Sequence, residues 1–217
     1  MKRTIVVLFL VFLVSNLSNA QFYKGFGVKA GTSISNQETE LYGSHFRYKF
    51  GFTAGVFKET DLIENLSLIV GLNFIQKGAL EPFYVTSETG QLLETKYFHR
   101  TVNMASIELL TKYGGNKDKL SPYILAGLRL DIFISAKNTL DGDELTRSFY
   151  SYPINNNKTF GGVIGMGLEF IPLKSLTTFI EGTYNPDFTN LGELTDRYNF
   201  SYTVRNYTFE IKTGIRF

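Results

Sequence analysis

The last stretch of the chain alternates between apolar and polar residues. From Tyr207 to Phe217 every second residue is apolar or threonine, and the residues between them include Glu210, Lys212 and Arg216. A period of two is typical of a β-strand with one apolar and one charged face. Because the pattern ends on an aromatic residue, it favours a strand that closes a barrel in a membrane.

Seven earlier segments show the same alternation, so we expect eight strands in all. In the least regular of them we place Ala105, Ile107 and Leu109 on the apolar face, with Ser106 and Glu108 opposite. The eight predicted strands are 22–35, 46–57, 66–77, 98–113, 123–135, 159–170, 176–184 and 202–217.

The connections between these segments alternate in length. Short links at 58–65, 114–122 and 171–175 take turns with longer polar links, which are 36–45, 79–97, 136–158 and 185–201. In an up-and-down barrel this places every long loop at one end and every short turn, with both termini, at the other. An outer-membrane barrel has this asymmetry, with its long loops outside the cell.

The alternation alone does not say which face points inward. If the charged face pointed outward, the chain would be a soluble barrel of the lipocalin type, and an ordinary β-sandwich is a further alternative. Glycines on the charged face favour the opposite orientation, because they weaken an exposed strand but make room in a narrow lumen. These glycines are Gly51, Gly55, Gly71, Gly127, Gly161, Gly165, Gly167 and Gly214.

We therefore predict an all-β fold, an eight-stranded antiparallel up-and-down transmembrane β-barrel. Its lumen should be plugged by buried charges of both signs, which must pair with one another. The charges expected inside are Lys29, Lys49, Arg129, Glu169, Glu181, Glu210, Lys212 and Arg216.

Aromatic residues of the apolar face lie where two interfacial girdles are expected. Those at the short-turn ends are Tyr113, Phe170 and Phe217, and those toward the long loops are Tyr48, Tyr184 and Tyr207.

The N-terminus has the pattern of a secretory signal. Lys2 and Arg3 precede an apolar stretch at 5–14 and the small residues Ser18 and Ala20. This predicts a cleaved signal peptide at 1–20 and a barrel domain at 21–217. An uncleaved anchor helix, the alternative, needs about 20 apolar residues. No cysteine follows Ala20, which argues against a lipoprotein.

Charge and cysteine content narrow the function further. Without Lys2 and Arg3 the chain has 20 basic and 20 acidic residues, a balance that argues against a nucleic-acid partner. The chain has no cysteine, so thiolate chemistry and disulfides are excluded.

Several short motifs resemble the PorT-like outer-membrane β-barrel family of Bacteroidetes. They are 27–31 with Ser35 and Asn36, 109–113, 121–123 leading to Ala126 and Gly127, and 160–162 with 165–170. One departure is Glu108, where that family often has a proline. The terminal 215–217 is similar to the signal read by the barrel-assembly machinery, although the usual upstream glycine is displaced to Gly214.

This resemblance implies a location and partners more than an activity. It implies a multi-pass barrel in the outer membrane of a Gram-negative cell, with both termini in the periplasm. The implied partners are outer-membrane lipid, the barrel-assembly machinery through the C-terminal strand, and envelope or secretion proteins.

Residues for catalysis are scarce. His45 and His99 lie near the predicted external rim, where Ser44, Glu94 or Asp143 would be the partners in a hydrolase. No nucleophile motif surrounds the two histidines, so we expect them to be solvated loop residues and the chain not to be an enzyme.

Cofactor and metal motifs are equally weak. The acidic run 141–144 lacks the spacing of an EF-hand loop, and we expect a solvated turn. The glycine-rich pieces 160–162 and 165–167 lie inside a strand and precede no helix, which argues against nucleotide binding. We therefore assign no catalytic, cofactor-binding or metal residue.

The leading hypothesis is a non-enzymatic outer-membrane barrel whose external loops bind envelope components, ligands or surfaces. Its motivation is the closed lumen and the aromatic loop segments 149–152 and 198–202. The alternatives are an accessory component of a protein secretion system, a small porin-like channel, and a surface hydrolase.

Overall fold

The computed structural model describes residues 25–39, 46–114, 119–140, 143–144, 156–173, 176–195 and 201–217. It contains eight long strands, and two short ones extend them. The long strands are β1 (Phe26–Thr39), β2 (Lys49–Ile63), β3 (Leu66–Thr86), β4 (Leu92–Gly114), β5 (Leu120–Leu140), β7 (Lys158–Leu173), β8 (Leu176–Pro186) and β10 (Ser201–Arg216). The short strands are β6 (Asp143–Glu144) and β9 (Gly192–Thr195).

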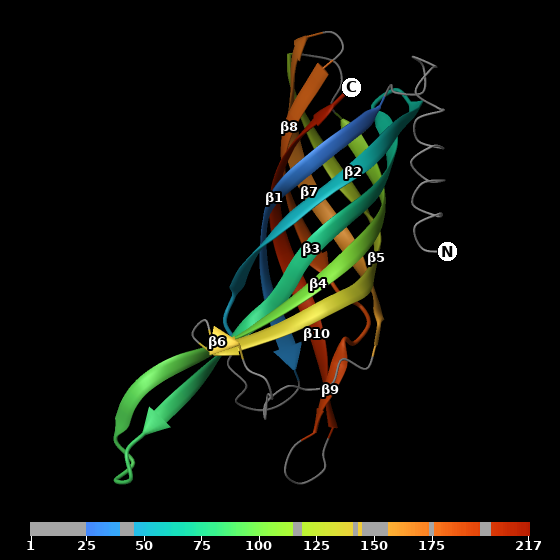
Figure 1. Cartoon of the computed structure of the whole chain (residues 1–217). Helices are drawn as coiled ribbons and strands as arrows, with labels where there is room; N and C mark the ends of the chain where they lie inside the picture. Colours follow the sequence, from blue (N-terminus) through green and yellow to red (C-terminus); the bar gives the residue numbers. More distant parts are fainter. Residues whose placement is uncertain are drawn as a thin grey trace, which may run out of the picture.

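The long strands form a closed ring. Each pairs antiparallel with its neighbour in the order β1-β2-β3-β4-β5-β7-β8-β10, and β10 pairs back onto β1 (Figure 1). The closing ladder runs from Gly27 opposite Arg216 to Thr39 opposite Val204. The predicted eight-stranded up-and-down barrel is confirmed. No helix in the described part of the chain is long and apolar enough to cross a membrane.

All eight predicted strands are present, and most are longer than the pattern indicated. β2 continues to Ile63, so the predicted link 58–65 shrinks to a turn at Glu64 and Asn65. Asn65 adopts a positive φ of 67°, which asparagine tolerates in tight turns. The predicted signal peptide and residues 22–24 of the first predicted strand lie outside the described residues.

The largest correction concerns 79–97, which we predicted to be a loop. Here β3 and β4 stay paired from Leu66 opposite Tyr113 to Thr86 opposite Leu92. Only a tight turn joins them, in which Ser87 N donates to Gln91 O at 2.8 Å. The two strands leave the barrel as a ribbon that leans away from its axis (Figure 1). We call residues 81–98 the β3–β4 ribbon.

The apolar face points outward. Phe50, Leu72 and Ile211 are 69%, 53% and 56% exposed, whereas Glu181 and Lys212, on the other face, are 5% and 1% exposed. In water such an apolar surface would be costly, but hydrocarbon is a suitable environment for it. A closed ring also pairs the backbone groups of the spanning strands, as a bilayer requires.

A ladder of polar side chains limits the apolar band at the end where the ribbon begins. Gln76 Nε2 donates to Asn103 Oδ1 at 3.1 Å, and Asn103 Nδ2 donates to Ser135 Oγ at 3.0 Å. Below this ladder, β4 presents alternate residues from Ala105 to Tyr113 outward. That span is about nine residues, the length of a transmembrane strand.

Both aromatic girdles are in place. Tyr113, Phe170 and Phe217 are exposed at the short-turn end. Toward the other end, the rings of Tyr48 and Tyr207 meet edge to face with their centroids 6.0 Å apart. Aromatic rings at both boundaries suit a barrel anchored in a bilayer.

Glycines of the inner face lie where lumen side chains come close. A Cβ added at Gly167 would lie 2.4 Å from Cζ of Tyr123, and one at Gly214 would lie 2.5 Å from Cζ of Phe179. The prediction that glycine makes room in the lumen is therefore confirmed at these positions. Gly71 is more open, because the nearest atom to its added Cβ is 3.4 Å away.

Candidate functional site

A layer of charged side chains fills the lumen at the short-turn end of the barrel. Lys112 Nζ pairs with Glu59 and lies 2.8 Å from Glu169 Oε1. Arg216 Nη1 pairs with the same two carboxylates and lies 3.3 Å from Glu169 Oε1. Two cations and two carboxylates from four strands therefore close this end of the lumen.

An apolar layer follows, which the predicted plug of paired charges did not include. Its members come from six strands and are Phe57, Ile69, Leu110, Tyr123, Leu125, Val163 and Phe179. The rings of Phe57 and Phe179 meet edge to face, 5.6 Å apart. A cavity beside this layer measures about 20 Å³, which is room for about one water molecule.

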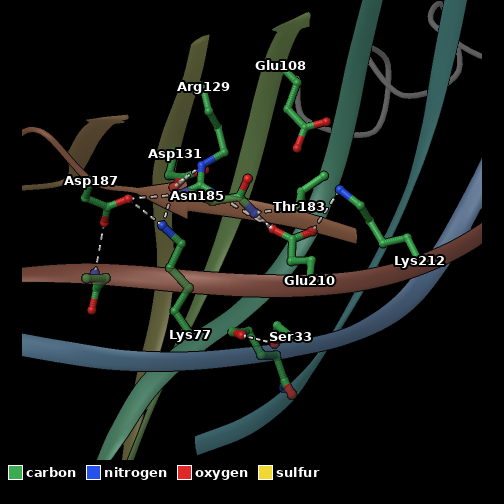
Figure 2. Close-up of polar contacts among 12 residues, drawn as sticks. Ser33, Lys77, Glu108, Arg129, Asp131, Thr183, Asn185, Asp187, Glu210 and Lys212 are labelled. Carbon is green, nitrogen blue, oxygen red and sulfur yellow. Dashed lines mark hydrogen bonds and ion pairs between the residues drawn. The ribbon is translucent and has the colours of Figure 1, made fainter. Parts of the chain in front are cut away.

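The middle of the lumen holds a second charged layer. Lys29 Nζ lies 2.8 Å from Glu108 Oε2 and 3.8 Å from Glu181 Oε1. Lys212 Nζ lies 3.2 Å from Glu181 Oε1 and 3.1 Å from Glu210 Oε2 (Figure 2). Glu108 thus ties the irregular fourth strand to β1, and the two faces that we predicted for this strand are confirmed.

A third charged layer lies toward the ribbon end. Arg129 Nε is 3.0 Å from Asp131 Oδ2, and Arg129 Nη2 is 2.9 Å from Asp187 Oδ1. Lys77 Nζ donates to both carboxylates and lies 2.8 Å from Asp187 Oδ1 (Figure 2). Asn206 Nδ2 donates to the other oxygen of Asp187 at 3.1 Å. These residues are at most 6% exposed, so their charges must compensate one another.

The segment 187–191, which we predicted to be part of an external loop, continues the wall of the barrel between β7 and β10. Asp187 N donates to Asn206 O at 2.9 Å, and Phe188 N donates to Phe160 O at 2.8 Å. The side chain of Leu191 is fully buried among Ile75, Val102 and Met104. The side chains of Asp187 and Leu191 therefore point from the wall into the lumen, where Asp187 pairs with Lys77 and Arg129.

Seven of the eight predicted lumen charges are buried in these layers, and Lys49 is not. Its Nζ donates to the carbonyl oxygen of Phe50 at 3.1 Å, at the rim of the barrel. The pattern put Lys49 on the inner face, but β2 begins at this residue, so its side chain is only partly buried at the rim.

The alternation of the predicted strands places Lys77 and Asp131 on the charged face, and both lie in the lumen. Sequence reasoning missed Asp187, which follows β8, because its segment was expected to be exposed. The three charged layers give the interior a structural role.

The β3–β4 ribbon is the most prominent external feature of the described residues. Tyr84, Leu92 and Leu93 are 57%, 58% and 66% exposed on it. Near its base, Arg47 Nη1 donates to the hydroxyl of Tyr97 at 2.9 Å. Burial raises the pKa of Glu81 above its ordinary value, and the positive charge of Arg100 opposes that shift. Exposed aromatic and aliphatic groups on a protruding element suit binding.

Of the residues weighed for a hydrolase, the structure describes the side chains of His99 and Glu94 and does not bring these two together. His99 lies within β4, opposite Leu80 and Thr139, and its position differs from that of Glu94 by five, an odd number. The two side chains therefore project from opposite faces of the ribbon. Ser44 and His45 lie outside the described residues, and the side chain of Asp143 is not described.

Other candidates fall partly outside the described chain. Of the acidic run 141–144, only the backbone of β6 is described, paired with β5. The aromatic segments 149–152 and 198–200 lie outside the described residues. Among the residues that the structure describes, no group of three or more His, Cys, Asp or Glu side chains could hold a metal ion.

Comparisons with known proteins match the whole barrel rather than any site. A family model described as the outer membrane protein beta-barrel domain matches residues 15–193. A search of curated proteins finds no match. Among solved structures, OprG from Pseudomonas aeruginosa is similar at 12% identity and a TM-score of 0.55, with 90% of this chain and 97% of that chain covered.

Two further solved structures match with lower TM-scores. Neisserial surface protein A shares 16% identity with a TM-score of 0.46, covering 89% of this chain and 98% of that one. The outer membrane protease OmpT from Escherichia coli shares 10% identity with a TM-score of 0.42, covering 88% and 95%. At these identities the likeness shows the fold alone, so no activity is carried over.

Proposed function

The chain belongs to the outer membrane protein beta-barrel domain family, and from this premise we propose that it binds envelope components through its external segments without being an enzyme. The outer membrane is the environment that its apolar band requires. The proposal concerns what the chain does there.

The proposal rests on the contrast between a lumen filled with side chains and an external ribbon that extends beyond the barrel. Three layers of ion pairs fill the lumen, and the buried side chains of Asp187 and Leu191 add to this filling near its mouth. Outside, the β3–β4 ribbon extends beyond the barrel with Tyr84, Leu92 and Leu93 exposed. A transporter needs a path through the lumen, whereas a binding protein needs an accessible surface.

The orientation in the membrane is part of the proposal. Both ends of the described chain meet at the short-turn end, where Phe217 N donates to Phe26 O at 2.8 Å. The ribbon, β6 and β9 lie at the opposite end (Figure 1). Since outer-membrane barrels have short periplasmic turns, we place both termini in the periplasm and the ribbon outside the cell.

The place of the chain in a particular family of outer-membrane barrels and its assembly partner are also proposals. The motifs of the middle strands support a place in the PorT-like family of Bacteroidetes. β10 closes the ring, and its last residues, Ile215 and Arg216, are followed by Phe217, which supports recognition by the barrel-assembly machinery through this strand. A role in protein secretion rests on that resemblance alone.

Deletion of the external segments tests the binding function. In one variant a two-residue turn replaces the β3–β4 ribbon, and in a second variant the segments 145–155 and 196–200 are shortened. Chemical cross-linking on intact cells should give fewer cross-linked envelope partners for the variants than for the full chain. Heat-modifiable migration on gels is the control for an intact barrel. Undiminished cross-linking by both variants would refute the proposal, and lost protein export would favour the secretion role.

A further inference from the structure

The β3–β4 ribbon has two long edges whose described partners end early. On one side, the bridge between Arg47 and Leu80 is the last contact of β3 with the β2 side. On the other side, pairing of β4 with β5 ends at Phe98 opposite Leu140. Beyond these points, the only strand pairing of 81–86 and 92–97 in the described part of the chain is the one between these two segments. Such edges are templates for a further strand.

The edge of β3 is protected. Arg47 N donates to Leu80 O at 2.8 Å and Leu80 N donates to Arg47 O at 3.0 Å, so the main chain of Leu80 points away from β4. Because this direction alternates along a strand, the main chain of Pro82 also points toward the open edge. Proline has no N–H to donate, and an added strand would lose a hydrogen bond there.

The edge of β4 has no such protection. His99 lies opposite Leu80, so its main chain points toward β5. Four residues earlier, the main chain of Thr95 points the same way, at a position that β5 does not reach. Thr95 therefore offers both an N–H and a carbonyl group to an incoming strand.

The side chains beside Thr95 carry opposite charges. Glu94 and Lys96 share one face of the ribbon, with Oε2 and Nζ 3.8 Å apart and the two side chains 60% and 37% exposed. If two copies of this strand pair antiparallel about Thr95, Glu94 of each copy lies opposite Lys96 of the other. The four charges then alternate in sign, and each carboxylate has an ammonium group on both sides.

We propose that the β4 edge of the ribbon pairs with the same edge of a second copy of this chain. Thr95 faces Thr95 of the second copy and exchanges two main-chain hydrogen bonds with it. Leu92 and Leu93, more than half exposed in a single copy, become partly covered by the added strand. The contact is isologous, so it closes at two copies and forms no chain of copies.

The shortness of the contact makes it weak in dilute solution, since it rests on few hydrogen bonds and on exposed ion pairs. Confinement to a membrane raises the effective concentration of one copy for another. Pro82 prevents the opposite edge from recruiting further strands, which is how natural sheets avoid aggregation. The inference stands apart from the proposed function, because it names no envelope component.

A single cysteine tests the pairing, because the chain contains no cysteine of its own. Facing residues of a hydrogen-bonded antiparallel pair have Cα atoms about 5.5 Å apart, which a disulfide can bridge. Thr95→Cys should therefore give a disulfide-linked dimer, in intact cells and in detergent micelles, at least about tenfold more than Thr89→Cys in the exposed turn. Heat-modifiable migration confirms that each variant is folded.

A second experiment reverses the charges of Glu94 and Lys96 in the Thr95→Cys variant and measures the yield of the disulfide-linked dimer. Glu94→Lys and Lys96→Glu should each lower the yield of dimer severalfold, because like charges then face each other. The double exchange should restore the yield of the Thr95→Cys parent. Equal yields for Thr95→Cys and Thr89→Cys would overturn the proposal. So would failure of the double exchange to restore the dimer, or a cross-link to a different protein.

Discussion

Lys29 of β1 and Glu108 of β4 meet across the lumen, with Nζ and Oε2 2.8 Å apart and both side chains at most 4% exposed. Seventy-nine residues separate them in the sequence. Neither charge has access to water, so each depends on the other to offset the cost of burial. The buried charges in the layers above and below depend on one another in the same way. This mutual dependence leads to the first prediction.

Glu108→Gln should destabilise the barrel, since it removes the negative charge closest to Lys29. Glu181 lies 3.8 Å from Lys29 and compensates in part, so we expect a loss of about 3 kcal/mol, the low end for breaking a buried pair. Urea unfolding in micelles, followed by gel migration, measures it. Glu88→Gln in the exposed ribbon turn is the control, and equal stability of the two variants would contradict this account of the lumen.

Asp187→Ala should loosen the filling of the lumen near its mouth. The change leaves Lys77 and Arg129 without one of their carboxylates, at the end of the lumen where Leu191 is buried. Single-channel recording in planar bilayers should show conductance close to zero for the unchanged chain and frequent openings for the variant. Glu94→Ala, on the ribbon, should remain closed. An Asp187→Ala variant that stays closed would mean that the ion pairs of Asp187 do not keep this end of the lumen filled.

Two glycines on opposite faces of neighbouring strands form a matched pair. Gly167→Ala places a methyl group against the ring of Tyr123 and should cost about 1–3 kcal/mol, as overpacking does. Gly182 faces outward with no atom within 4 Å of an added Cβ, so Gly182→Ala should change stability by no more than about 0.5 kcal/mol. Urea unfolding of both variants tests this, and a reversed order would mean that the faces are assigned incorrectly.

Stability should respond to pH through Glu81, which lies beyond the polar ladder and outside the apolar band. Burial raises its pKa, so the folded chain binds the proton more tightly than the unfolded chain. The resulting destabilisation is present at neutral pH and is relieved as pH falls through the raised pKa. Glu81→Gln should therefore be more stable than the unchanged chain at pH 7, and the gap should narrow in acid.

Hydrogen exchange of the ribbon amides, measured across this pH range, follows the effect of Glu81 locally. Glu88→Gln, at an exposed position, is the control and should show no gap at any pH. A gap for Glu81→Gln that widens as pH falls would contradict the assigned direction.

The orientation of the strands could be predicted from the sequence because each spanning strand separates two chemically different environments. Charges and glycines at one parity and apolar residues at the other are enough to fix the face, as at Lys212 and Ile211. The apolar layer of the lumen could not be found in this way. Leu110 follows Leu109 and Leu125 follows Ile124, so both parities are apolar there and a period of two carries no information.

The external features were harder to predict from the sequence, for a different reason. In the β3–β4 ribbon both faces meet water, so no alternation of polarity reports the strand, and proline, as at Pro82, is uncommon inside strands. The burial of Asp187 depends on Lys77 and Arg129, which are distant in sequence. Which carboxylate pairs with which cation follows from the register of the closed ring and not from local pattern.

The central claim is that the apolar face of every spanning strand meets lipid and the charged face is enclosed. The chain has no tryptophan, so a single introduced tryptophan reports its own surroundings. Phe50 is 69% exposed on the outer face and Phe179 is 8% exposed in the lumen. In vesicles of lipids brominated on their acyl chains, fluorescence of Phe50→Trp should be strongly quenched and that of Phe179→Trp should be almost unaffected. Stronger quenching of Phe179→Trp than of Phe50→Trp would contradict the claim.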